Sequence, residues 1–316
     1  MRTMAYKIRA LTESDGPALT AFLDTVFHIR NRDKTRLVQW KYFHPFVQKR
    51  VQFGSFDGDR LIAHYANIPL TVRYHSTVVS AMLCIDMSTR PSYRGLGLIS
   101  KLSEVAYAAI AKTPRALSIG FSNSAGVKVD LYAHSYGYRV VGPFSSYGLM
   151  AVHSKNPPVI LTQTKEFRSF EYHIPDGYIS INKSIDYMVW RYQDHPGLPY
   201  GIYAIERENE LLGYVIVRIS SFRIDIIDIV LSNMQEYLVR DVIVSVQHLA
   251  FLLRKQLVVL GALDNEYWKR ILHGVLGMKK PMNDAYYLTV RVHKNSVIGP
   301  DVYDLKHWIC MTGDIL

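Results

Sequence analysis

One segment of the chain, residues 88–102, constrains the fold more than any other. It joins an apolar, strand-like run to a helix-like run through the loop Arg94-Gly95-Leu96-Gly97. Glycines at such a junction let the backbone approach a ligand closely and adopt angles that other residues disfavour. The helix that follows points its free N–H groups and the positive end of its dipole toward this loop. The segment therefore predicts a strand–loop–helix unit with a site for a pyrophosphate group.

The composition limits the class of protein. Of the 316 residues, 49% are hydrophobic and 20% are charged, which is typical of a well-packed soluble protein with room for two domains. No apolar run reaches the roughly 18 residues that span a membrane. The two cysteines, Cys84 and Cys310, are too few for a disulfide scaffold or a cysteine zinc site. We therefore expect a cytoplasmic protein without a transmembrane segment and without a metal.

The formal net charge of +10 indicates an anionic partner. The lysines and arginines are scattered, however, and no zinc-finger, RNP or basic-zipper pattern accompanies them. Binding of nucleic acid is therefore not expected. A phosphate-rich cofactor with an acidic or membrane-borne acceptor accounts for the charge more simply.

Strand and helix signals alternate along the first half of the chain. Strands are expected over residues 6–10, 51–56, 61–74, 78–87 and 117–121 and from residue 138, and helices over 12–27, 36–43, 98–111 and 125–135. This order, β-α-α-β-β-β-α-β-α-β, is typical of a mixed α/β sheet. Pro157 and Pro158 exclude a helix over residues 154–166, and we interpret this segment as a linker between two domains.

The second half of the chain is similar to the first at an offset of 150 residues. Trp40 precedes a His-Pro pair, and so does Trp190. The later signals also follow a similar order, with strands over residues 225–230 and 257–263, helices over 236–254 and 265–275, and a closing strand over 286–292. We interpret this similarity as an internal duplication. The glycine loop has no counterpart, because residues 231–235 contain no glycine.

The pattern Pro-x-x-Arg-Gly-x-Gly followed by an apolar residue, from Pro91 to Leu98, resembles motif A of the GNAT superfamily of acyl-CoA-dependent N-acetyltransferases. Residues 8–15 are similar to the first strand and helix of many members. Residues 120–123 together with 136–138 are similar to motif B. The resemblance covers the first half of the chain well and the second half only as a degenerate copy.

This resemblance implies an α/β fold of two tandem GNAT-like domains, each a mixed, mostly antiparallel sheet flanked by helices. The first domain would comprise residues 1–153 and carry the motif A loop. Residues 154–166 would be the linker, and residues 167–316 a degenerate GNAT-like domain.

The resemblance also implies that the donor substrate is acetyl-CoA or another acyl-CoA. In the superfamily, backbone amides of the loop that matches residues 94–99 hold the pyrophosphate, and backbone groups matching residues 87–89 polarise the thioester carbonyl. Asn123 would bind the pantetheine or order the turn of motif B. The cofactor-binding residues expected on this basis are Met87, Ser88, Thr89, Arg94, Gly95, Leu96, Gly97, Leu98, Ile99 and Asn123. Ile99 departs from the Gly or Ala that is usual there, and its side chain must therefore point into the core.

The resemblance defines the catalytic residues less sharply. Many members use a tyrosine four residues before the glycine of motif B to protonate the leaving thiolate, and here that position is Ala133. Tyr132 is our first candidate for this acid and Tyr136 the second, with a packing role as the alternative for each. By strand alternation we expect Asp86 to share a face with Cys84 and Ser88. We predict that Asp86 is the general base if this face lines the cleft, and a structural carboxylate if it faces a helix.

The sequence thus predicts an enzyme that transfers an acetyl group from acetyl-CoA to a primary amine of a small molecule or sugar. The amine would attack the thioester directly in a ternary complex, with the second half completing the acceptor cleft. Two alternatives are a non-catalytic acyl-CoA sensor and a transferase that uses longer acyl-CoA or aminoacyl-tRNA donors. The acceptor and the oligomeric state are not specified by the sequence.

Overall fold

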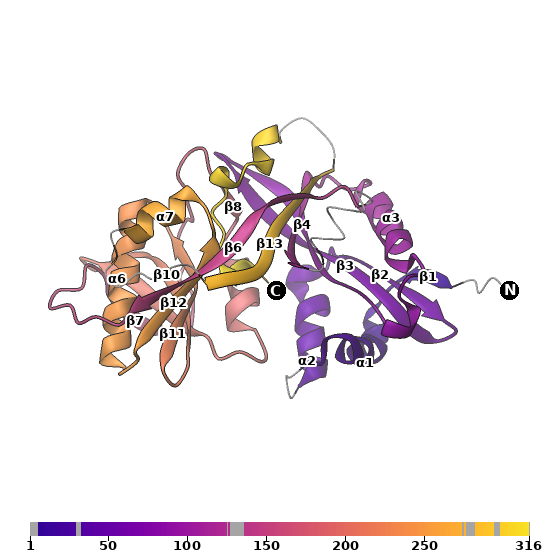
Figure 1. Cartoon of the computed structure of the whole chain (residues 1–316), viewed down its shortest axis with the longest axis horizontal. Coiled ribbons are helices and arrows are strands. Elements are labelled where there is room, and N and C mark those ends of the chain that lie inside the picture. Colours follow the sequence, from indigo (N-terminus) through magenta and orange to yellow (C-terminus); the bar gives the residue numbers. More distant parts are fainter. Residues whose placement is uncertain are drawn as a thin grey trace.

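The structure of this chain is a computed structural model, which describes residues 6–29, 33–124, 126, 136–273, 275, 282–293 and 298–315. Its strands are β1 (Lys7–Ala10), β2 (Val51–Asp57), β3 (Arg60–Tyr74), β4 (Thr77–Thr89), β5 (Leu117–Asn123), β6 (Arg139–Met150), β7 (Ile160–Thr164), β8 (Ile179–Ile181), β9 (Gly201–Arg207), β10 (Glu210–Ile219), β11 (Arg223–Leu231), β12 (Leu257–Leu263) and β13 (Met282–Val292). Its α-helices are α1 (Gly16–Phe27), α2 (Lys34–Val38), α3 (Leu98–Ile110), α5 (Ile185–Met188), α6 (Glu236–Leu252) and α7 (Glu266–His273). The helix expected over residues 125–135 lies almost entirely outside the described residues. Figure 1 shows two lobes, which correspond broadly to the two halves of the chain.

A single sheet runs through both lobes (Figure 1). Its strand order is β1-β2-β3-β4-β5-β13-β6-β12-β11-β10-β9-β7, and β8 pairs with β3 outside this path. Among the described strands, the parallel pairings are β4 with β5 and β11 with β12, and the others are antiparallel. The predicted fold class, a mixed and mostly antiparallel sheet flanked by helices, is confirmed.

The two halves of the chain exchange the strands that close their parts of the sheet. β6, from the first half, pairs with β12, whereas β13, from the second half, pairs with β5. β6 and β13 also pair with each other at the centre of the sheet. Leu288 and Val290 of β13 are fully buried in the main core, and the Thr289 hydroxyl donates to the carbonyl of Gly120 on β5 at 3.1 Å. The strand over 286–292 therefore closes the first half rather than the second.

Part of the segment expected to be a linker is a strand. β7 lies within residues 154–166 and pairs with β9 at the far edge of the sheet. Pro157 and Pro158 precede this strand, so they interfere with none of its hydrogen bonds. The predicted domain boundaries stay a prediction, and a cut at this segment separates each half from its closing strand.

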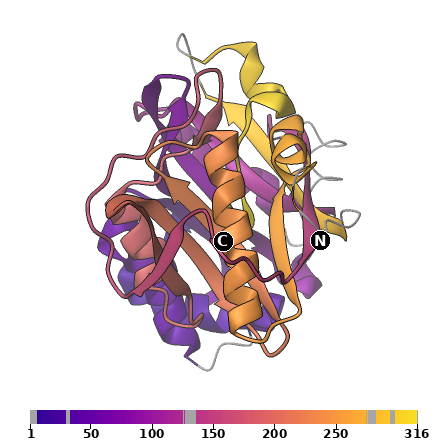
Figure 2. The same cartoon turned by 90° about the vertical axis from the view of Figure 1, so that its left-hand side faces the viewer.

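Helices cover the sheet on both sides. Every fourth residue of α3 is apolar and buried, which makes this helix amphipathic: Leu98, Leu102, Ala106 and Ile110. These side chains pack with Tyr65 of β3 in a core that is separate from the main one. In the other lobe, α6 lies along the sheet over β11 and β12 (Figure 2). None of the helices in the described part of the chain is both long enough and apolar enough to cross a membrane.

Two tryptophans join the halves at equivalent places. Trp40 lies in a π-helical turn, Gln39–Phe43, that follows α2, and Trp190 lies in a π-helical turn, Val189–Gln193, that follows α5. Their rings stack with centroids 5.3 Å apart and planes 15° apart. The indole N–H of Trp40 donates to the carbonyl of Trp190 at 2.6 Å, and that of Trp190 donates to the carbonyl of Trp40 at 3.2 Å. Residues related by the 150-residue offset therefore meet reciprocally between the lobes.

Candidate active site

The glycine loop presents a row of backbone N–H groups at the start of α3. Gly95 and Gly97 have φ of +80° and +68°, a region that disfavours residues with a Cβ. No atom lies within 4 Å of the place where a Cβ would stand on either glycine. Within the described part of the chain, the N–H groups of residues 95–99 donate no hydrogen bond. Free N–H groups and the dipole of α3 together make this loop suited to bind an anion.

The side chains of the loop leave this row accessible. Arg94 and Leu96 are exposed, and Leu98 is buried beneath the helix. Ile99 packs against the apolar cluster under α3, which is the orientation that its size requires.

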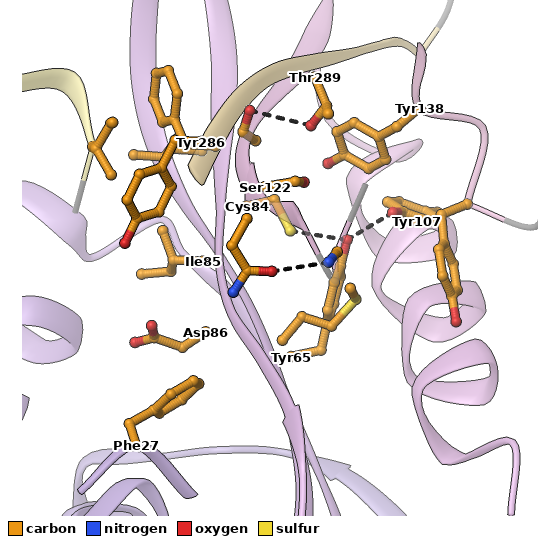
Figure 3. A pocket seen from close by; sticks show the side chains of 18 residues that line it. Phe27, Tyr65, Cys84, Ile85, Asp86, Tyr107, Ser122, Tyr138, Tyr286 and Thr289 are labelled. Atoms are coloured by element: carbon orange, nitrogen blue, oxygen red, sulfur yellow. Dashed lines mark hydrogen bonds between the residues drawn. The ribbon is translucent and has the colours of Figure 1, made fainter. Parts of the chain in front are cut away.

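β4 and β5 separate beyond Cys84 and open a cavity between them. Their parallel pairing runs from Ala81 with Leu117 to Cys84 with Gly120 and ends there. The cavity has a volume of about 350 Å³ and is lined by residues of both strands, with tyrosines from β3, α3 and β13 (Figure 3). Among the described strands, none pairs with β4 on this side beyond Cys84, and an extended ligand can pair with such an edge.

A bulge in β4 places two consecutive side chains, Ile85 and Asp86, on the same side of the strand (Figure 3). Asp86 has φ of +49°, and the register of β4 against β3 shifts between His64 and Ala66. Ile85 packs in the main core and Asp86 contacts Tyr42 of that core, whereas Cys84 and Met87 pack against the cluster under α3. The expectation that Asp86 shares a face with Cys84 is therefore wrong, because the extra residue of the bulge shifts the alternation of β4 by one position. Ser88 is buried, and its hydroxyl donates to the carbonyl of Asp86 at 3.0 Å.

Asp86 is held by two neighbours from the first π-helical turn. The ammonium of Lys41 lies 2.7 Å from its carboxylate, and the Tyr42 hydroxyl donates to the same oxygen. Burial opposes the charged form of Asp86, but the charge of Lys41 and the hydrogen bonds from Lys41 and Tyr42 outweigh burial and lower the pKa of Asp86. The carboxylate is therefore ionised at neutral pH and lies at one end of the cavity (Figure 3).

His64 supports the bulge from behind. The Arg50 guanidinium donates to the side-chain oxygen of Gln52 at 2.9 Å, so the amide nitrogen of Gln52 faces Nε2 of His64 at 2.9 Å. Nδ1 of His64 then carries the proton and donates to the carbonyl of Asp86 at 3.1 Å. Burial lowers the pKa of His64 to about 4. The ring is neutral and fully hydrogen-bonded, so it positions Asp86.

A group of tyrosines lines the opposite end of the cavity (Figure 3). The hydroxyls of Tyr65 and Tyr107 lie 2.6 Å apart, and the thiol of Cys84 donates to the Tyr65 hydroxyl at 3.4 Å. Burial raises the pKa of Tyr65, Tyr107 and Tyr138, so all three keep their protons at neutral pH. The sequence gives no sign of this group, because its members lie in β3, in α3 and just before β6 without any common spacing.

The remaining predicted residues have the following places. Tyr136 is buried and lines the cavity, with its hydroxyl 3.3 Å from that of Ser100 in the first turn of α3. Asn123 also lines the cavity, and its side-chain oxygen accepts a hydrogen bond from the backbone N–H of Gly126 at 2.9 Å. Tyr132 lies outside the described residues. The roles assigned to these residues stay predictions.

A second, larger cavity of about 750 Å³ lies where the two halves meet. Trp40 and Lys41 line it from the first half, and Arg191 is among the residues that line it from the second half. Tyr286 and Ile315 line both cavities, so the two adjoin. Among the described residues, no group of three or more His, Cys, Asp or Glu side chains is arranged to hold a metal ion.

The second half repeats one contact of the first without its glycine loop. The Tyr192 hydroxyl donates to Asp228 on β11 at 2.5 Å, as the Tyr42 hydroxyl does to Asp86 on β4. The ammonium of Lys183 lies 2.8 Å from Asp228, and both groups are buried. The tyrosine–aspartate contact is thus common to both halves, while the glycine loop occurs in the first half.

Comparison with known proteins agrees with this geometry. Residues 7–141 match the model of the acetyltransferase (GNAT) domain family. This part of the chain, which contains the glycine loop and most of the residues that line the β4–β5 cavity, therefore belongs to the GNAT superfamily. The class of protein is a GNAT-type N-acyltransferase, as the sequence predicted. No curated protein matches the chain by sequence.

Solved structures share the fold over nearly the whole chain. A GCN5-related N-acetyltransferase of Anabaena variabilis is 12% identical and has a TM-score of 0.69, covering 92% of this chain and 73% of its own. A protein of Enterococcus faecalis described as a probable N-acyltransferase is 14% identical with a TM-score of 0.68, covering 91% of this chain and 73% of its own. Eis1 of Mycobacterium abscessus is 14% identical with a TM-score of 0.58, covering 92% and 74%. At these identities the likeness is one of fold.

Proposed function

We propose that the first half transfers an acetyl group from acetyl-CoA directly to a primary amine in a ternary complex. The observation that carries this proposal is the row of N–H groups from residue 95 to residue 99, which donate no hydrogen bond in the described part of the chain. A pyrophosphate would accept several charge-assisted hydrogen bonds there, each worth about 1.5–3 kcal/mol. The pantetheine would then extend along the open edge of β4 toward the cavity.

The acetyl group would be activated by backbone groups. In the proposal, the thioester carbonyl faces the backbone of residues 87–89, where β4 leaves β5 and the bulge exposes main-chain groups. N–H groups that are already oriented stabilise the oxyanion as it forms, at no further cost in reorganisation.

The acceptor amine would enter at the Asp86 end of the cavity. The carboxylate of Asp86 attracts an ammonium group, and in the proposal it takes the proton directly or through water. The low pKa of Asp86 keeps it charged for this purpose, but it also limits its strength as a base. The free amine then attacks the carbonyl carbon, the C–S bond breaks, and the thiolate of coenzyme A receives a proton.

Tyrosine hydroxyls supply candidates for that last proton transfer. Tyr132 and Tyr136 are the candidates from the sequence, and Tyr136 lines the cavity. Tyr65 and Tyr107 add protonated hydroxyls on the same cavity. Replacing each of the four by phenylalanine and measuring kcat against pH would identify the acid, because its loss lowers kcat without weakening acetyl-CoA binding.

The experiment that tests the function measures release of coenzyme A from acetyl-CoA with a panel of primary amines. Turnover with any of them supports the proposal. Binding of acetyl-CoA without turnover on a wide panel would favour the non-catalytic sensor. Thermal stabilisation by long-chain acyl-CoA or charged tRNA, with none by acetyl-CoA, would instead favour the alternative donors.

A further inference from the structure

The cavity between the two halves carries an excess of positive charge. Four cationic side chains line it, with one described carboxylate, that of Asp225. Lys41 is neutralised by Asp86 at 2.7 Å. Arg218 and Arg223 share Asp225, at 3.2 Å and 2.9 Å. Arg218, Arg223 and Asp225 together therefore carry a net charge of +1.

Arg191 adds a second positive charge that has no carboxylate partner among the described residues. Its side chain is 4% exposed. The guanidinium donates to the carbonyls of Gly313 and Ile315, at 3.0 Å and 2.8 Å, and to the hydroxyl of Tyr200 at 3.2 Å. A guanidinium has five N–H donors, so three contacts leave two donors for a further acceptor. A buried charge without a counter-ion is costly, and this one borders the cavity.

The neutral lining does not offset this charge. Burial lowers the pKa of His195 to about 4, so this side chain is uncharged at neutral pH. The other described residues that line the cavity, apart from those above, carry no charge. The cavity therefore favours an anion, and it disfavours an acceptor that carries several positive charges.

The two adjoining cavities favour ligand groups of opposite charge. Lys41 and Tyr42 both contact Oδ2 of Asp86, so its Oδ1 can still accept a hydrogen bond from an ammonium group in the cavity between β4 and β5. Arg191, Arg218 and Arg223 offer guanidinium groups in the adjoining cavity. Tyr286 and Ile315 border both, and Lys41 reaches from the second cavity to Asp86. A molecule with an ammonium group at one end and an anionic group at the other fits this arrangement of charge.

We infer that the acceptor is a primary amine that also bears an oxyanion, a carboxylate or a phosphate, and that Arg191, Arg218 and Arg223 bind this oxyanion. Guanidinium groups suit either anion, because their N–H donors match the spacing of two oxygens. The inference rests on the proposed acetyl transfer, and it adds the class of acceptor. Polyamines and other polycationic amines would then be poor acceptors.

The test compares acceptors that differ in the oxyanion alone. The matched pairs are β-alanine with β-alaninamide, phosphoethanolamine with ethanolamine, and glucosamine phosphate with glucosamine. We expect kcat/KM for the anionic member of at least one pair to exceed that of its neutral partner about tenfold or more, as one charge-assisted contact allows. The pair with the largest ratio distinguishes a carboxylate from a phosphate. Equal values within every pair, or spermidine as the best acceptor, would overturn the inference.

Two variants test whether the arginines of this cavity cause the preference for acceptors that carry an oxyanion. Arg218→Gln leaves Asp225 paired with Arg223, so we expect it to fold normally and to raise KM about tenfold for the anionic acceptor alone. Arg207→Gln is the matched control, because Arg207 makes a similar half-exposed ion pair with Asp241 at 2.6 Å and does not line the cavity. An equal change in KM for anionic and neutral acceptors in Arg218→Gln would contradict the inference.

Failure of the proposed transfer would be distinguished by direct binding. If no amine is acetylated, calorimetric titration with the three anionic compounds still tests the cavity, with and without coenzyme A present. Binding that is lost in Arg218→Gln and kept in Arg207→Gln would support the oxyanion site although the transfer had failed. Absence of binding by the parent protein would overturn the inference together with the assignment of the cavity.

Discussion

Gly97 is the N-cap residue of α3. Its backbone conformation disfavours a side chain, whereas the space around it would admit one. Its φ of +68° costs a residue with a side chain about 1–2 kcal/mol. The space around it is free of other protein atoms within 4 Å of a Cβ position, so a side chain there meets no neighbour in the fold. Such a side chain would instead block the approach of a ligand to the free N–H groups of the loop.

We therefore expect Gly97→Val to abolish acetyl-CoA binding while the protein stays folded. Gly58→Val is the matched control, because Gly58 has a similar φ of +57°, has equally open surroundings, and lies in the turn between β2 and β3. Both variants should lose similar stability in chemical denaturation, and calorimetry with acetyl-CoA should separate them. Unchanged affinity in Gly97→Val would remove the loop from the cofactor site.

The ion pair between Asp86 and Lys41 leads to a prediction about pH. The pKa of Asp86 is lower in the folded protein than its ordinary value near 3.9. The contact therefore stabilises the fold fully above that value, and this stabilisation is lost as the pH falls through the lower, folded-state pKa. Lys41→Met removes the charge while Asp86 stays partly buried, with 20% of its side chain exposed, so we expect the variant to be about 2 kcal/mol less stable at neutral pH.

The same variant should regain stability relative to the parent as the carboxyl becomes protonated. Denaturation at a series of pH values from about 6 to about 3 would show the difference shrinking toward acid. Lys34→Met is the control, because it removes an ion pair with Asp24 that is 37% exposed on both sides and contributes below about 1 kcal/mol. A difference between Lys41→Met and the parent that is independent of pH would mean that Lys41 does not hold Asp86 in its charged form.

Residues that local sequence defines were predictable, and residues defined by long-range packing were not. Gly95 and Gly97 stand out because a strand–loop–helix junction needs them locally. Asp86 was identified, but its bulge was not, because a positive φ at an aspartate leaves no mark in the alternation of apolar residues. Tyr65 and Tyr107 meet only because α3 packs on β3, and no spacing along the chain indicates this contact.

At the scale of elements, the exchange of β6 and β13 decides which pieces of the chain fold together. The last strands of the two halves were predicted near their correct residues, yet their partners were not. Strand pairing is a non-local choice, and two strands of similar length and pattern give no local signal of which neighbour each will take. If the chain is divided at the predicted linker, each half therefore lacks the strand that completes its part of the sheet.

This exchange predicts the behaviour of a fragment. Residues 1–153 lack β13 and with it the buried Leu288 and Val290, so we expect the fragment neither to unfold cooperatively nor to bind acetyl-CoA. β6 and β13 are antiparallel, with Met282 opposite Ser146. A short linker can therefore join residue 150 to residue 282, and a chain of residues 1–150 followed by 282–293 should regain part of both properties.

Circular dichroism during denaturation and calorimetry with acetyl-CoA would measure cooperative unfolding and cofactor binding in the two shortened chains. If residues 1–153 alone unfold in one sharp transition and bind acetyl-CoA as the full chain does, β6 has taken the place of β13. The boundary at residue 153 would then describe an independent domain, and the exchange would not be needed for folding.

At the scale of the whole molecule, the two lobes are joined by the continuous sheet and by the Trp40–Trp190 contact. The 150-residue offset in the sequence relates the two tryptophans to each other. It does not indicate that each indole donates a hydrogen bond to the backbone of the other tryptophan. The basic cavity borders the same contact, since Trp40 and Arg191 line it together. Stability of the junction and shape of the proposed acceptor site therefore depend on the same residues.

We expect Trp190→Ala and Trp40→Ala each to destabilise the protein by about 3–5 kcal/mol, because both rings are buried. The loss of unfolding free energy in the double variant should be smaller than the sum of the two single losses, by about 1 kcal/mol or more. Each single change already removes the ring stacking and weakens the paired hydrogen bonds. Unfolding of the parent should follow one transition, because the exchanged strands and the tryptophans couple the lobes. Denaturation followed by circular dichroism gives all three values. Additive losses, together with two separate transitions in the parent, would mean that the lobes fold independently and that the tryptophan contact forms between two already completed domains.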